Sequence, residues 1–256
     1  MLSQITPLIL TFNEAPNISR VLERLTWASR IVVLDSLSTD ETEAICRRFP
    51  QVEFLQRTFV DHTSQWNFGL DQVHTDWVLT LDADYVLSEA LVEELRRWQP
   101  GEAVACFARF RYSVFGKPLR ASLYPPRAIL FRKSKCRYEP DGHTQRLLIR
   151  GATTQLTGVV FHDDRKTLSH WLSAQERYTA LEVKKLLTTP TSHLALPDRL
   201  RKTILPAPVL VLFYTLFIKG LILEGWRGWF YVLQRVLAEL LLSLRFIEAR
   251  LQGRGD

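Results

Sequence analysis

The chain has 256 residues, of which 46% are hydrophobic and 23% are charged. A chain of this length and apolar content can bury a substantial core, which excludes intrinsic disorder and predicts one large domain or a domain with an appendage. The three cysteines, Cys46, Cys106 and Cys136, are far apart and odd in number. They argue against a zinc site and a disulfide framework and favour a reducing compartment.

The net charge of +6 is divided unequally along the chain. Residues 1–100 carry 8 Lys or Arg against 15 Asp or Glu, whereas residues 101–256 carry 25 against 12. An acidic first half suits a metal site, and a basic second half suits phosphates or an anionic membrane face. Nucleic acid is not expected as a partner, because the aromatic residues of the basic half lie in long apolar segments and no nucleic-acid-binding motif is present.

The first hundred residues alternate short apolar runs with helical patterns, as βαβ units do. Strands are predicted at residues 8–12, 31–34, 52–55 and 77–81, and helices at 18–25, 38–48, 64–73 and 88–98. We expect the helix at 38–48 to open with a capping box formed by Ser38 and Glu41, and Ser88 to cap the last of these helices.

The apolar run at 77–81 is followed by two carboxylates, Asp82 and Asp84, with only Ala83 between them. Ligands of open α/β sheets bind outside the carboxyl ends of the strands, where both carboxylates could reach one small cation. Mg²⁺ or Mn²⁺, held by one or two carboxylates and by substrate phosphates, is the natural occupant. An isolated Asp-x-Asp can equally be no more than a polar strand end, since turns favour Asp.

Two other predicted strands end in polar residues. Asn13 and Glu14 follow the first strand, and Asp35 follows the second. In a parallel sheet these ends line one crevice, where they would bind a base and a ribose beside metal-held phosphates. This repetition favours the metal site over a plain strand end.

Four stretches carry a recognisable pattern, namely Leu10-Thr11-Phe12-Asn13-Glu14 with Asn17-Ile18, Ile31-Val32-Val33-Leu34-Asp35-Ser36-Leu37-Ser38-Thr39-Asp40, Gln65-Trp66-Asn67 and Asp76-Trp77-Val78-Leu79-Thr80-Leu81-Asp82-Ala83-Asp84. Together they resemble the family 2 glycosyltransferases, and among these the branch of the lipopolysaccharide core glucosyltransferases. The resemblance is dense to about residue 90 and thinner beyond it, at Gly142-His143, His162 and 220–230. It implies an α/β GT-A fold, a Rossmann-like mixed sheet flanked by helices.

The resemblance also implies an activity and its residues. The activity is an inverting, metal-dependent transfer of a sugar from a nucleotide-diphosphate sugar, which we expect to be a UDP-sugar, to a lipid-linked or lipopolysaccharide-type glycan at the membrane. The donor would be bound by Thr11, Asn13, Glu14, Asp35, Gln65, Asp82 and Arg127, with Arg132 as an alternative to Arg127. The metal, Mg²⁺ or Mn²⁺, would be held by Asp82, Asp84 and His162, with His143 in reserve.

The sequence departs from the family pattern at two positions. Leu37 stands where a glycine is usual, which can alter the turn, and Thr144 stands where a glutamate commonly follows the histidine. Because a threonine hydroxyl accepts no proton usefully near neutral pH, another group must be the catalytic base. Asp141, three residues before Thr144, is the leading candidate, and Asp163 and Asp164 are the alternatives.

Beyond residue 100 the pattern predicts strands with one face in water, at 107–112, 127–132 and 145–149. A helix at 168–187 is expected to turn Trp171, Leu172, Tyr178 and Leu181 inward, and a break follows at 188–190. We assign residues 1–190 to the glycosyltransferase domain, with a donor half at 1–100 and an acceptor half at 101–190.

Residues 191–256 are expected to form amphipathic helices at a membrane surface. Residues 203–218 carry no charge, but this run contains two prolines and is shorter than the ~20 residues that a spanning helix needs. Basic residues precede the run, and an aromatic cluster at 225–231 suits the level of lipid headgroups. A final helix carries apolar residues on one side, namely Val232, Val236, Leu240, Leu244, Ile247 and Leu251. Such a helix lies on a membrane, which we favour, or packs between subunits of a homo-oligomer.

The N-terminus lacks the basic region and the long apolar run of a signal peptide, so we expect a cytoplasmic protein, peripheral on the cytoplasmic face of the inner membrane. Two other functions stay open. A polyprenyl-phosphate sugar synthase would share the donor half and differ in its acceptor. A non-catalytic membrane scaffold would have kept the fold and lost the base.

Overall fold

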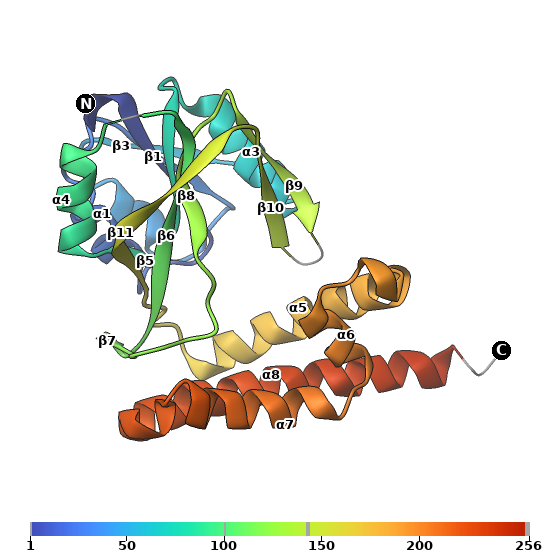
Figure 1. The fold of residues 1–256 in the computed structure, drawn as a ribbon. Coiled ribbons are helices and arrows are strands. Elements are labelled where there is room, and N and C mark those ends of the chain that lie inside the picture. The colour runs from blue at the N-terminus through green and yellow to red at the C-terminus, as the bar shows by residue number, and fades with distance from the viewer. Residues whose placement is uncertain (1, 100, 142–143, 254–256) are drawn as a thin grey trace. The chain divides into compact units, whose positions relative to one another are not determined.

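The computed structural model describes residues 2–99, 101–141 and 144–253, and it divides into two compact units (Figure 1). Unit 1 consists of Met1–Pro118 and Tyr124–Arg165, and unit 2 of Leu119–Leu123 and Lys166–Asp256.

Unit 1 is built from two sheets and four α-helices. The strands are β1 (Ile5–Thr11), β2 (Ile31–Asp35), β3 (Val52–Gln56), β4 (Trp77–Asp82), β5 (Tyr85–Leu87), β6 (Ala103–Val114), β7 (Lys117–Pro118), β8 (Arg127–Arg132), β9 (Cys136–Asp141), β10 (Thr144–Ile149) and β11 (Ala152–His162). The helices are α1 (Ile18–Glu23), α2 (Thr42–Cys46), α3 (His62–Gln72) and α4 (Glu89–Arg97), with a 3-10 turn η1 (Leu2–Gln4) before β1.

The larger sheet has nine strands in the order β3-β2-β1-β4-β8-β6-β11-β5, with β7 paired to β6. Strands β1 to β4 run parallel to one another, and β8 runs antiparallel to both β4 and β6. Because β6 and β11 are parallel to each other, both point the same way as β4. The sheet is therefore mixed, and β1, β2, β4 and β11 all end at the same edge.

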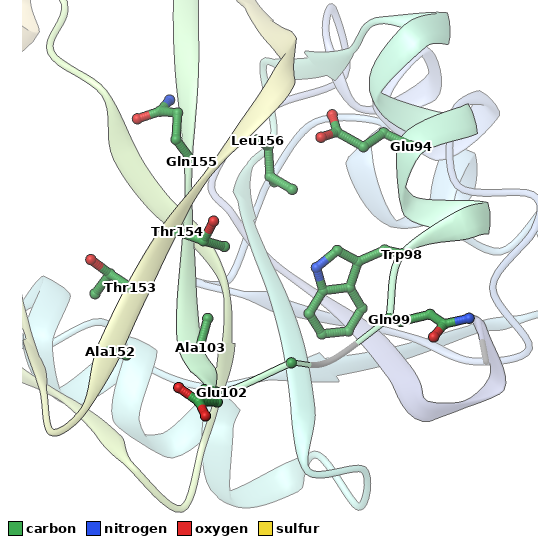
Figure 2. Close-up of a pocket in the computed structure, with 11 residues that line it drawn as sticks. Glu94, Trp98, Gln99, Glu102, Ala103, Ala152, Thr153, Thr154, Gln155 and Leu156 are labelled. Atoms are coloured by element: carbon green, nitrogen blue, oxygen red, sulfur yellow. The ribbon is translucent and has the colours of Figure 1, made fainter.

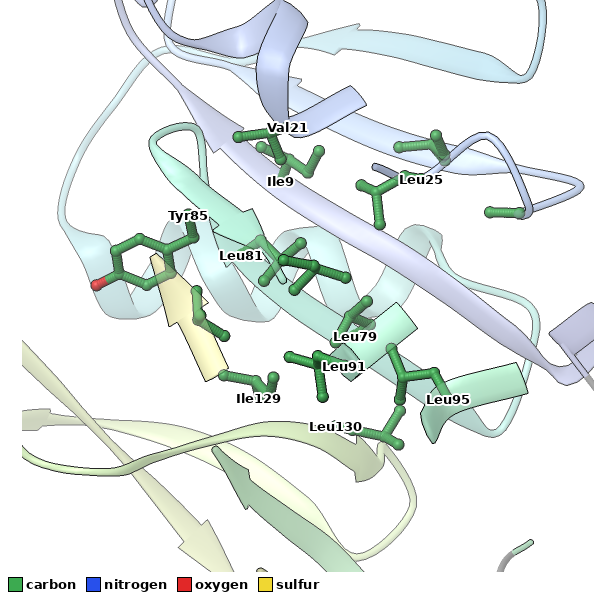
Figure 3. Packing of buried hydrophobic residues seen from close by; sticks show 14 of the residues in the cluster. Ile9, Val21, Leu25, Leu79, Leu81, Tyr85, Leu91, Leu95, Ile129 and Leu130 are labelled. Carbon is green, nitrogen blue, oxygen red and sulfur yellow. The ribbon is translucent and has the colours of Figure 1, made fainter. Parts of the chain in front are cut away.

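The two faces of this sheet are both covered. On one face, Ile9 and Leu79 pack with α1 and α4, and Figure 3 shows this cluster around Val21, Leu81 and Leu91. On the other face, Leu8, Val32 and Val78 pack with α3 and the β9–β10 hairpin. Neighbouring residues of one strand thus pack into the two cores on opposite faces of the sheet, which explains why the sequences of the first strands are continuous apolar runs.

Most predicted elements of unit 1 are confirmed with shifted ends. The strands predicted at 31–34, 52–55, 77–81 and 127–132 are β2, β3, β4 and β8, and Ser88 caps α4 by accepting a hydrogen bond from the backbone N of Leu91 at 3.2 Å. The first strand begins earlier than expected, at Ile5, and the strand predicted at 107–112 extends over Ala103–Val114.

The predicted capping box is wrong. Helix α2 begins at Thr42, after a Glu41 that makes no side-chain cap. The Ser38 hydroxyl instead accepts a hydrogen bond from the backbone N of Asn13 and donates one to Asp35. Asp35 is the last residue of β2 and Asn13 lies in the loop after β1, and these contacts replace the pairing with Glu41 that the S-x-x-E spacing predicts.

Unit 2 is helical. It contains α5 (Leu168–Thr188), α6 (Leu196–Lys202), α7 (Pro206–Phe213) and α8 (Gly225–Gln252), with short turns η2 (Thr191–His193), η3 (Tyr214–Ile218, a π-helix) and η4 (Leu221–Glu224). Helix α8 packs against α5 and α7, and its Leu242 and Phe246 meet Val183 and Leu186 of α5 in a small core.

The inward face predicted for α5 is wrong at two of its four residues. Leu172 and Leu181 are exposed, whereas Trp171 and Tyr178 are half-buried. The buried residues of α5 are Thr179, Glu182, Val183 and Leu186. In the described part of the chain, no single helix is long and apolar enough to cross a membrane. The pair Pro206–Ile218 and Leu221–Gln252 meets the length and composition criteria together, but it is bent by 70°.

Candidate active site at the carboxyl ends of the strands

Four polar side chains meet at the edge where the parallel strands end. Thr11 of β1 stands opposite Asp35 of β2, and Leu10 of β1 stands opposite Asp82 of β4. His162 ends β11, which points the same way. Residues that are far apart in the sequence thus share one edge because their strands run in one direction.

Asp35 fixes the loop that follows β2. Its carboxylate is fully buried, and it accepts hydrogen bonds from Thr11 Oγ1 at 2.8 Å and from the backbone N of Ser38 at 2.7 Å. Gln56 Nε2 lies 3.4 Å from the same carboxylate. A carboxylate with this many donors holds the loop at 36–40 in one conformation.

The β1–α1 loop and the β2–α2 loop are bonded to each other. Asn13 Oδ1 accepts a hydrogen bond from the backbone N of Thr39 at 2.8 Å, and the backbone N of Glu14 donates to Thr42 Oγ1 at 2.8 Å. Asn13 and Leu37 both have a left-handed backbone, with φ of 53° and 64°. Leu37 therefore keeps the conformation for which glycine is usual, at a cost of about 1–2 kcal/mol.

Gln65 contacts the loop that follows β2. It is fully buried near the start of α3, donates from Nε2 to Ser36 Oγ at 3.2 Å, and accepts from Arg57 NH1 at 3.2 Å. Helix α3 is held in place at its N-terminus by Asp61, which accepts a hydrogen bond from the backbone N of Ser64 at 2.7 Å. Gln65 thus connects helix α3 to the loop that Asp35 fixes.

Asp84 and His162 are in direct contact at the edge of the sheet where β4 and β11 end. His162 Nε2 lies 3.0 Å from Asp84 Oδ2, and the backbone N of Asp163 donates to the Asp84 carbonyl at 3.0 Å. Burial lowers the pKa of His162, but the charge and hydrogen bond of Asp84 and the charges of Asp82 and Asp164 together outweigh it and raise this pKa above its ordinary value. Burial, and then the charge of Asp84, raise the pKa of Asp82. Asp82 and Asp84 are therefore close enough to repel each other when both are ionised.

Asp82, Asp84 and His162 are of residue types that bind a divalent cation, although their side chains do not form a complete set of ligands. In the described part of the chain, no three His, Cys, Asp or Glu side chains are grouped closely enough to hold a metal ion. The structure does bring Asp84 and His162 together, and His162 Nδ1 is buried without a hydrogen-bond partner among the described residues. Two carboxylates and an imidazole suit a cation that takes its remaining ligands from phosphates and water.

Three tyrosines surround His162, and they were not predicted from the sequence. The ring centroids of Tyr85, Tyr112 and Tyr124 lie 5.3, 5.0 and 5.0 Å from that of His162. The Arg127 guanidinium lies 4.7 Å from the Tyr124 ring centroid, and its NH1 donates to the Tyr85 hydroxyl at 3.3 Å. Tyr85 follows Asp84 directly and could have been inferred, whereas Tyr124 lies in a loop without a signal.

Arg127 and Arg132 lie at opposite ends of β8. Arg132 stands opposite Trp77 at the start of β4, so it belongs to the far edge of the sheet, where it lies over the Trp77 ring. Arg127 begins β8 at the edge where β4 ends, and its charge acts on Asp82. Of the two arginines considered for the diphosphate, the structure places only Arg127 at the candidate site.

A buried polar network ties the β1–α1 loop to the end of β11. Asn17, which is fully buried, donates from Nδ2 to Glu14 Oε2 at 2.8 Å and to Asp164 Oδ1 at 3.0 Å. Asp163 is also buried and pairs with Arg20 and Arg165. Asp163 is thus held by two ion pairs, and this network was not predicted from the sequence.

Asp141 lies elsewhere, on the two-stranded β9–β10 hairpin, and is exposed. The hairpin is anchored to α3 because Asn67 Nδ2 donates to the Tyr138 carbonyl at 3.0 Å and Asn67 Oδ1 accepts from the Tyr138 N at 3.1 Å. Trp66 stacks on the Tyr138 ring at 5.4 Å. His143, the reserve metal ligand, lies outside the described residues. The structure thus places the predicted base on a hairpin, and the predicted donor residues on the main sheet, on the loop after β1 and on α3.

A surface pocket of about 480 Å³ lies at another part of unit 1, between the end of α4 and the starts of β6 and β11 (Figure 2). Its walls include Glu94, Trp98, Ala103 and Thr154. Because β6 and β11 begin here and end at the candidate site, this pocket is at the opposite edge of the sheet.

Among solved structures, the chain is similar to mannosyltransferase PcManGT from Pyrobaculum calidifontis in complex with GDP-Man and Mn²⁺. The TM-score is 0.55 at 14% identity, over 94% of this chain and 87% of that one. It is also similar to S. aureus TarS 1-349 in complex with UDP-GlcNAc, with a TM-score of 0.52 at 11% identity, over 96% and 92%. These similarities confirm the expected GT-A fold.

Among curated proteins, an uncharacterized glycosyltransferase of Rickettsia felis is 30% identical over 95 residues, which are 37% of this chain and 33% of that protein. The lipopolysaccharide core biosynthesis glycosyltransferase LpsC of Rhizobium meliloti is 31% identical over 91 residues, 34% of each protein. The matches thus span about a third of these relatives. Residues 8–157 match the glycosyl transferase family 2, more than half of the chain, and the chain therefore belongs to this family.

Proposed function

We propose that the chain is an inverting glycosyltransferase that moves a sugar from a nucleotide-diphosphate sugar, a UDP-sugar, to a lipid-linked or lipopolysaccharide-type glycan with the help of a divalent metal. The observation that carries this proposal is the 3.0 Å approach of Asp84 and His162 at the edge where β1 and β2 end in Thr11 and Asp35. LpsC, a relative named for lipopolysaccharide core biosynthesis, and similar folds solved with GDP-Man plus Mn²⁺ and with UDP-GlcNAc support it.

The donor's base and ribose are assigned to the loops after β1 and β2. Asn13 and Glu14 are half-buried there, so part of each residue is exposed to a ligand. Thr11, Asp35 and Gln65 are buried, and their hydrogen bonds keep those loops in place. The buried residues thus act on nucleotide affinity mainly by holding the loops that form the contact surface.

The diphosphate is assigned to the acidic centre of the edge. Asp84 and His162 would hold the cation, with Asp82 as a further oxygen ligand, and the bound cation would offset the charge that builds on the leaving diphosphate. Arg127 would add a permanent positive charge beside Asp82. Its guanidinium is already oriented by the Tyr124 ring and the Tyr85 hydroxyl. An arginine fixed in this way loses little side-chain entropy when it meets a phosphate.

In an inverting transfer, a carboxylate takes the proton of an acceptor hydroxyl while that oxygen bonds to the anomeric carbon. The bond between that carbon and the diphosphate breaks, and its electron pair leaves with the nucleoside diphosphate. Asp141 is our candidate for this carboxylate, because the exposed hairpin leaves it accessible to an acceptor. Asp163 is a poor base because Arg20 and Arg165 hold its charge. Asp164, which accepts a hydrogen bond from Asn17, is the alternative.

The test is an incubation of the purified full chain with a panel of nucleotide sugars, Mn²⁺ and a lipid extract of a bacterial envelope. We expect nucleoside diphosphate release from one donor and a new lipid-extractable product that is heavier by one sugar in a mass spectrum. A product in which the sugar is linked to a polyprenyl phosphate would assign the chain to the sugar synthases instead. Absence of nucleoside diphosphate release from every donor would contradict the proposal.

The proposed location of the protein is the cytoplasmic face of the inner membrane.

A further inference from the structure

Exposed apolar side chains are concentrated in unit 2. In the described part of the chain, only five large exposed hydrophobic residues belong to unit 1, namely Phe12, Leu37, Phe59, Val60 and Phe115. The others belong to unit 2, and many of them lie on α7, η3, η4 and α8. A soluble surface seldom exposes apolar residues in such a concentration without a partner.

Helix α8 has two apolar faces. One face is buried within unit 2 and includes Tyr231, Ala238, Leu242 and Phe246. The other face is an exposed stripe whose members follow one another at spacings of three or four residues after Trp226, namely Leu233, Leu237, Leu240, Leu244, Ile247 and Leu251. The single apolar side predicted from the sequence mixed the two faces, because Val232 is buried and Leu244 is exposed.

The exposed stripe does not end with α8. Trp226, at the start of α8, is 88% exposed, and the preceding arm of the bent helix pair exposes Val209, Phe213, Phe217 and Ile218. Both arms of this 70° bend therefore present apolar side chains. Tryptophan at the end of such a surface is typical of side chains at the level of lipid headgroups.

The charges of unit 2 complement an anionic surface. Five acidic side chains are neutralised by ion pairs within the unit. The pairs are Glu176 with Arg245, Glu182 with Lys185, Asp198 and Glu239 with Arg201, and Glu224 with Arg120. In contrast, Arg227, Lys184 and Arg250 are exposed and form no ion pair in the described part of the unit, where Glu248 is the single acid without one. Unit 2 therefore presents unneutralised positive charge together with its apolar stripe.

We propose that the exposed stripe of α8, together with the exposed side chains of α7 and η3, is a binding surface for anionic phospholipid. The apolar side chains enter the boundary between headgroups and acyl chains, and the basic residues contact the lipid phosphates. This inference rests on the proposed function and deepens it, since it supplies the means by which the enzyme would reach a lipid-linked acceptor.

A second copy of the chain is the rival occupant, because spacings of three and four residues also characterise coiled coils. In a coiled coil, charged residues usually flank the apolar seam and select the partner. Four of the six residues that flank the α8 stripe, Gln234, Val236, Leu241 and Ser243, carry no charge, and only the two at its C-terminal end, Glu248 and Arg250, are charged. The exposed apolar residues also continue beyond α8, so the surface is broader than a helix–helix seam. These features favour lipid.

The test is co-sedimentation of the full chain with vesicles of phosphatidylcholine alone or of equal parts phosphatidylcholine and phosphatidylglycerol. We expect binding to the anionic vesicles that weakens as salt rises. The double variant Leu233→Ser/Leu244→Ser should weaken this binding at least about tenfold, because two inserted leucines are lost. The matched control is Leu168→Ser/Leu187→Ser, which changes two leucines of similar exposure on α5 and should alter binding less than about twofold. Circular dichroism checks that both variants are folded.

Fluorescence gives a second readout. Anionic vesicles should shift the emission of the wild type to shorter wavelength, and the shift should be largely absent in Trp226→Phe, because Trp226 is the most exposed residue of the stripe. Absence of vesicle binding by the wild type would overturn the inference, as would equal losses in the stripe and control variants. A wild-type dimer that the stripe variant converts to a monomer, without vesicle binding, would assign the stripe to a second copy.

Failure of this inference can be distinguished from failure of the proposed function. Nucleoside diphosphate release from a soluble donor needs no membrane, so Leu233→Ser/Leu244→Ser should retain it. Asp84→Asn should bind vesicles as the wild type does. Vesicle binding without donor turnover would therefore refute the proposed function alone, and turnover without vesicle binding would refute the lipid surface alone.

Discussion

His162 Nε2 lies 3.0 Å from Asp84 Oδ2, although 78 residues separate them in the sequence. The contact exists because β4 and β11 point the same way and end at the same edge of the sheet. Burial, and then the charge of Asp84, raise the pKa of Asp82, as expected of two neighbouring carboxylates, and a divalent cation between them would relieve their repulsion.

Asp141→Asn should bind the donor normally and transfer its sugar at least ~100-fold more slowly, because an amide cannot accept the acceptor's proton. Donor affinity is measured by calorimetry and transfer by product formation. Asp164→Asn is the comparison, and it should transfer at nearly the normal rate. Unchanged transfer in Asp141→Asn together with loss in Asp164→Asn would move the base to the end of β11.

Leu37→Gly should make the protein more stable. Leu37 has a φ of 64°, which costs an ordinary residue about 1–2 kcal/mol, and its exposed side chain contributes little burial. Part of the gain is offset by the greater flexibility of glycine in the unfolded chain, so we expect a net gain of about 0.5–1 kcal/mol. The corresponding rise in melting temperature is about 1–4 °C. Leu37→Ala keeps the strained Cβ and is the control. Equal melting temperatures for the two variants would show that the turn is not strained.

All three cysteines should be unreactive in the native protein. Burial raises the pKa of Cys46 to about 12 and those of Cys106 and Cys136 to about 11. At pH 8, below all three values, each thiol stays protonated, and the protonated form is the unreactive one. A disulfide reagent should therefore label the native protein slowly and all three thiols rapidly in denaturant. Rapid labelling of the folded chain would contradict the buried positions.

Asn67→Ala should loosen the β9–β10 hairpin. The variant removes both hydrogen bonds to the Tyr138 backbone, which should cost about 1–3 kcal/mol of stability. Cys136, at the start of β9, should then react faster with the same reagent. Asp71→Ala is the control, since it removes only the exposed ion pair with Arg137, which is worth at most ~1 kcal/mol. Equal effects of the two variants would show that Asn67 does not anchor the hairpin.

The sequence predicted which acids lie at the edge of the sheet, because apolar runs that end in acids mark the carboxyl ends of parallel strands. Asp35, Asp82 and Asp84 were found in this way. Strand β11 was missed because its first half is polar and exposed, so only the family resemblance identified His162. The contacts of Tyr124 depend on where its loop lies, and no local pattern encodes that.

The S-x-x-E spacing at Ser38 and Glu41 shows the limit of local rules. The spacing satisfies the pattern of a capping box, yet the Ser38 hydroxyl contacts Asp35 and Asn13 instead. Those partners become neighbours only when β1 and β2 pair in register. The same reasoning applies to Asn17 and Asp164, which meet across the fold and were not predicted to do so.

The central claim is that Asp84 helps to hold a cation that sugar transfer requires. The most direct measurement is nucleoside diphosphate release from the active donor, with Mn²⁺ and with a chelator, by the wild type, Asp84→Asn and Asp76→Asn. Asp76 precedes β4 at the far edge of the sheet, so its variant is the matched control. The account predicts release that needs the metal, falls at least ~100-fold in Asp84→Asn and is unchanged in Asp76→Asn. Equal release by Asp84→Asn, or by the wild type in chelator, would contradict it.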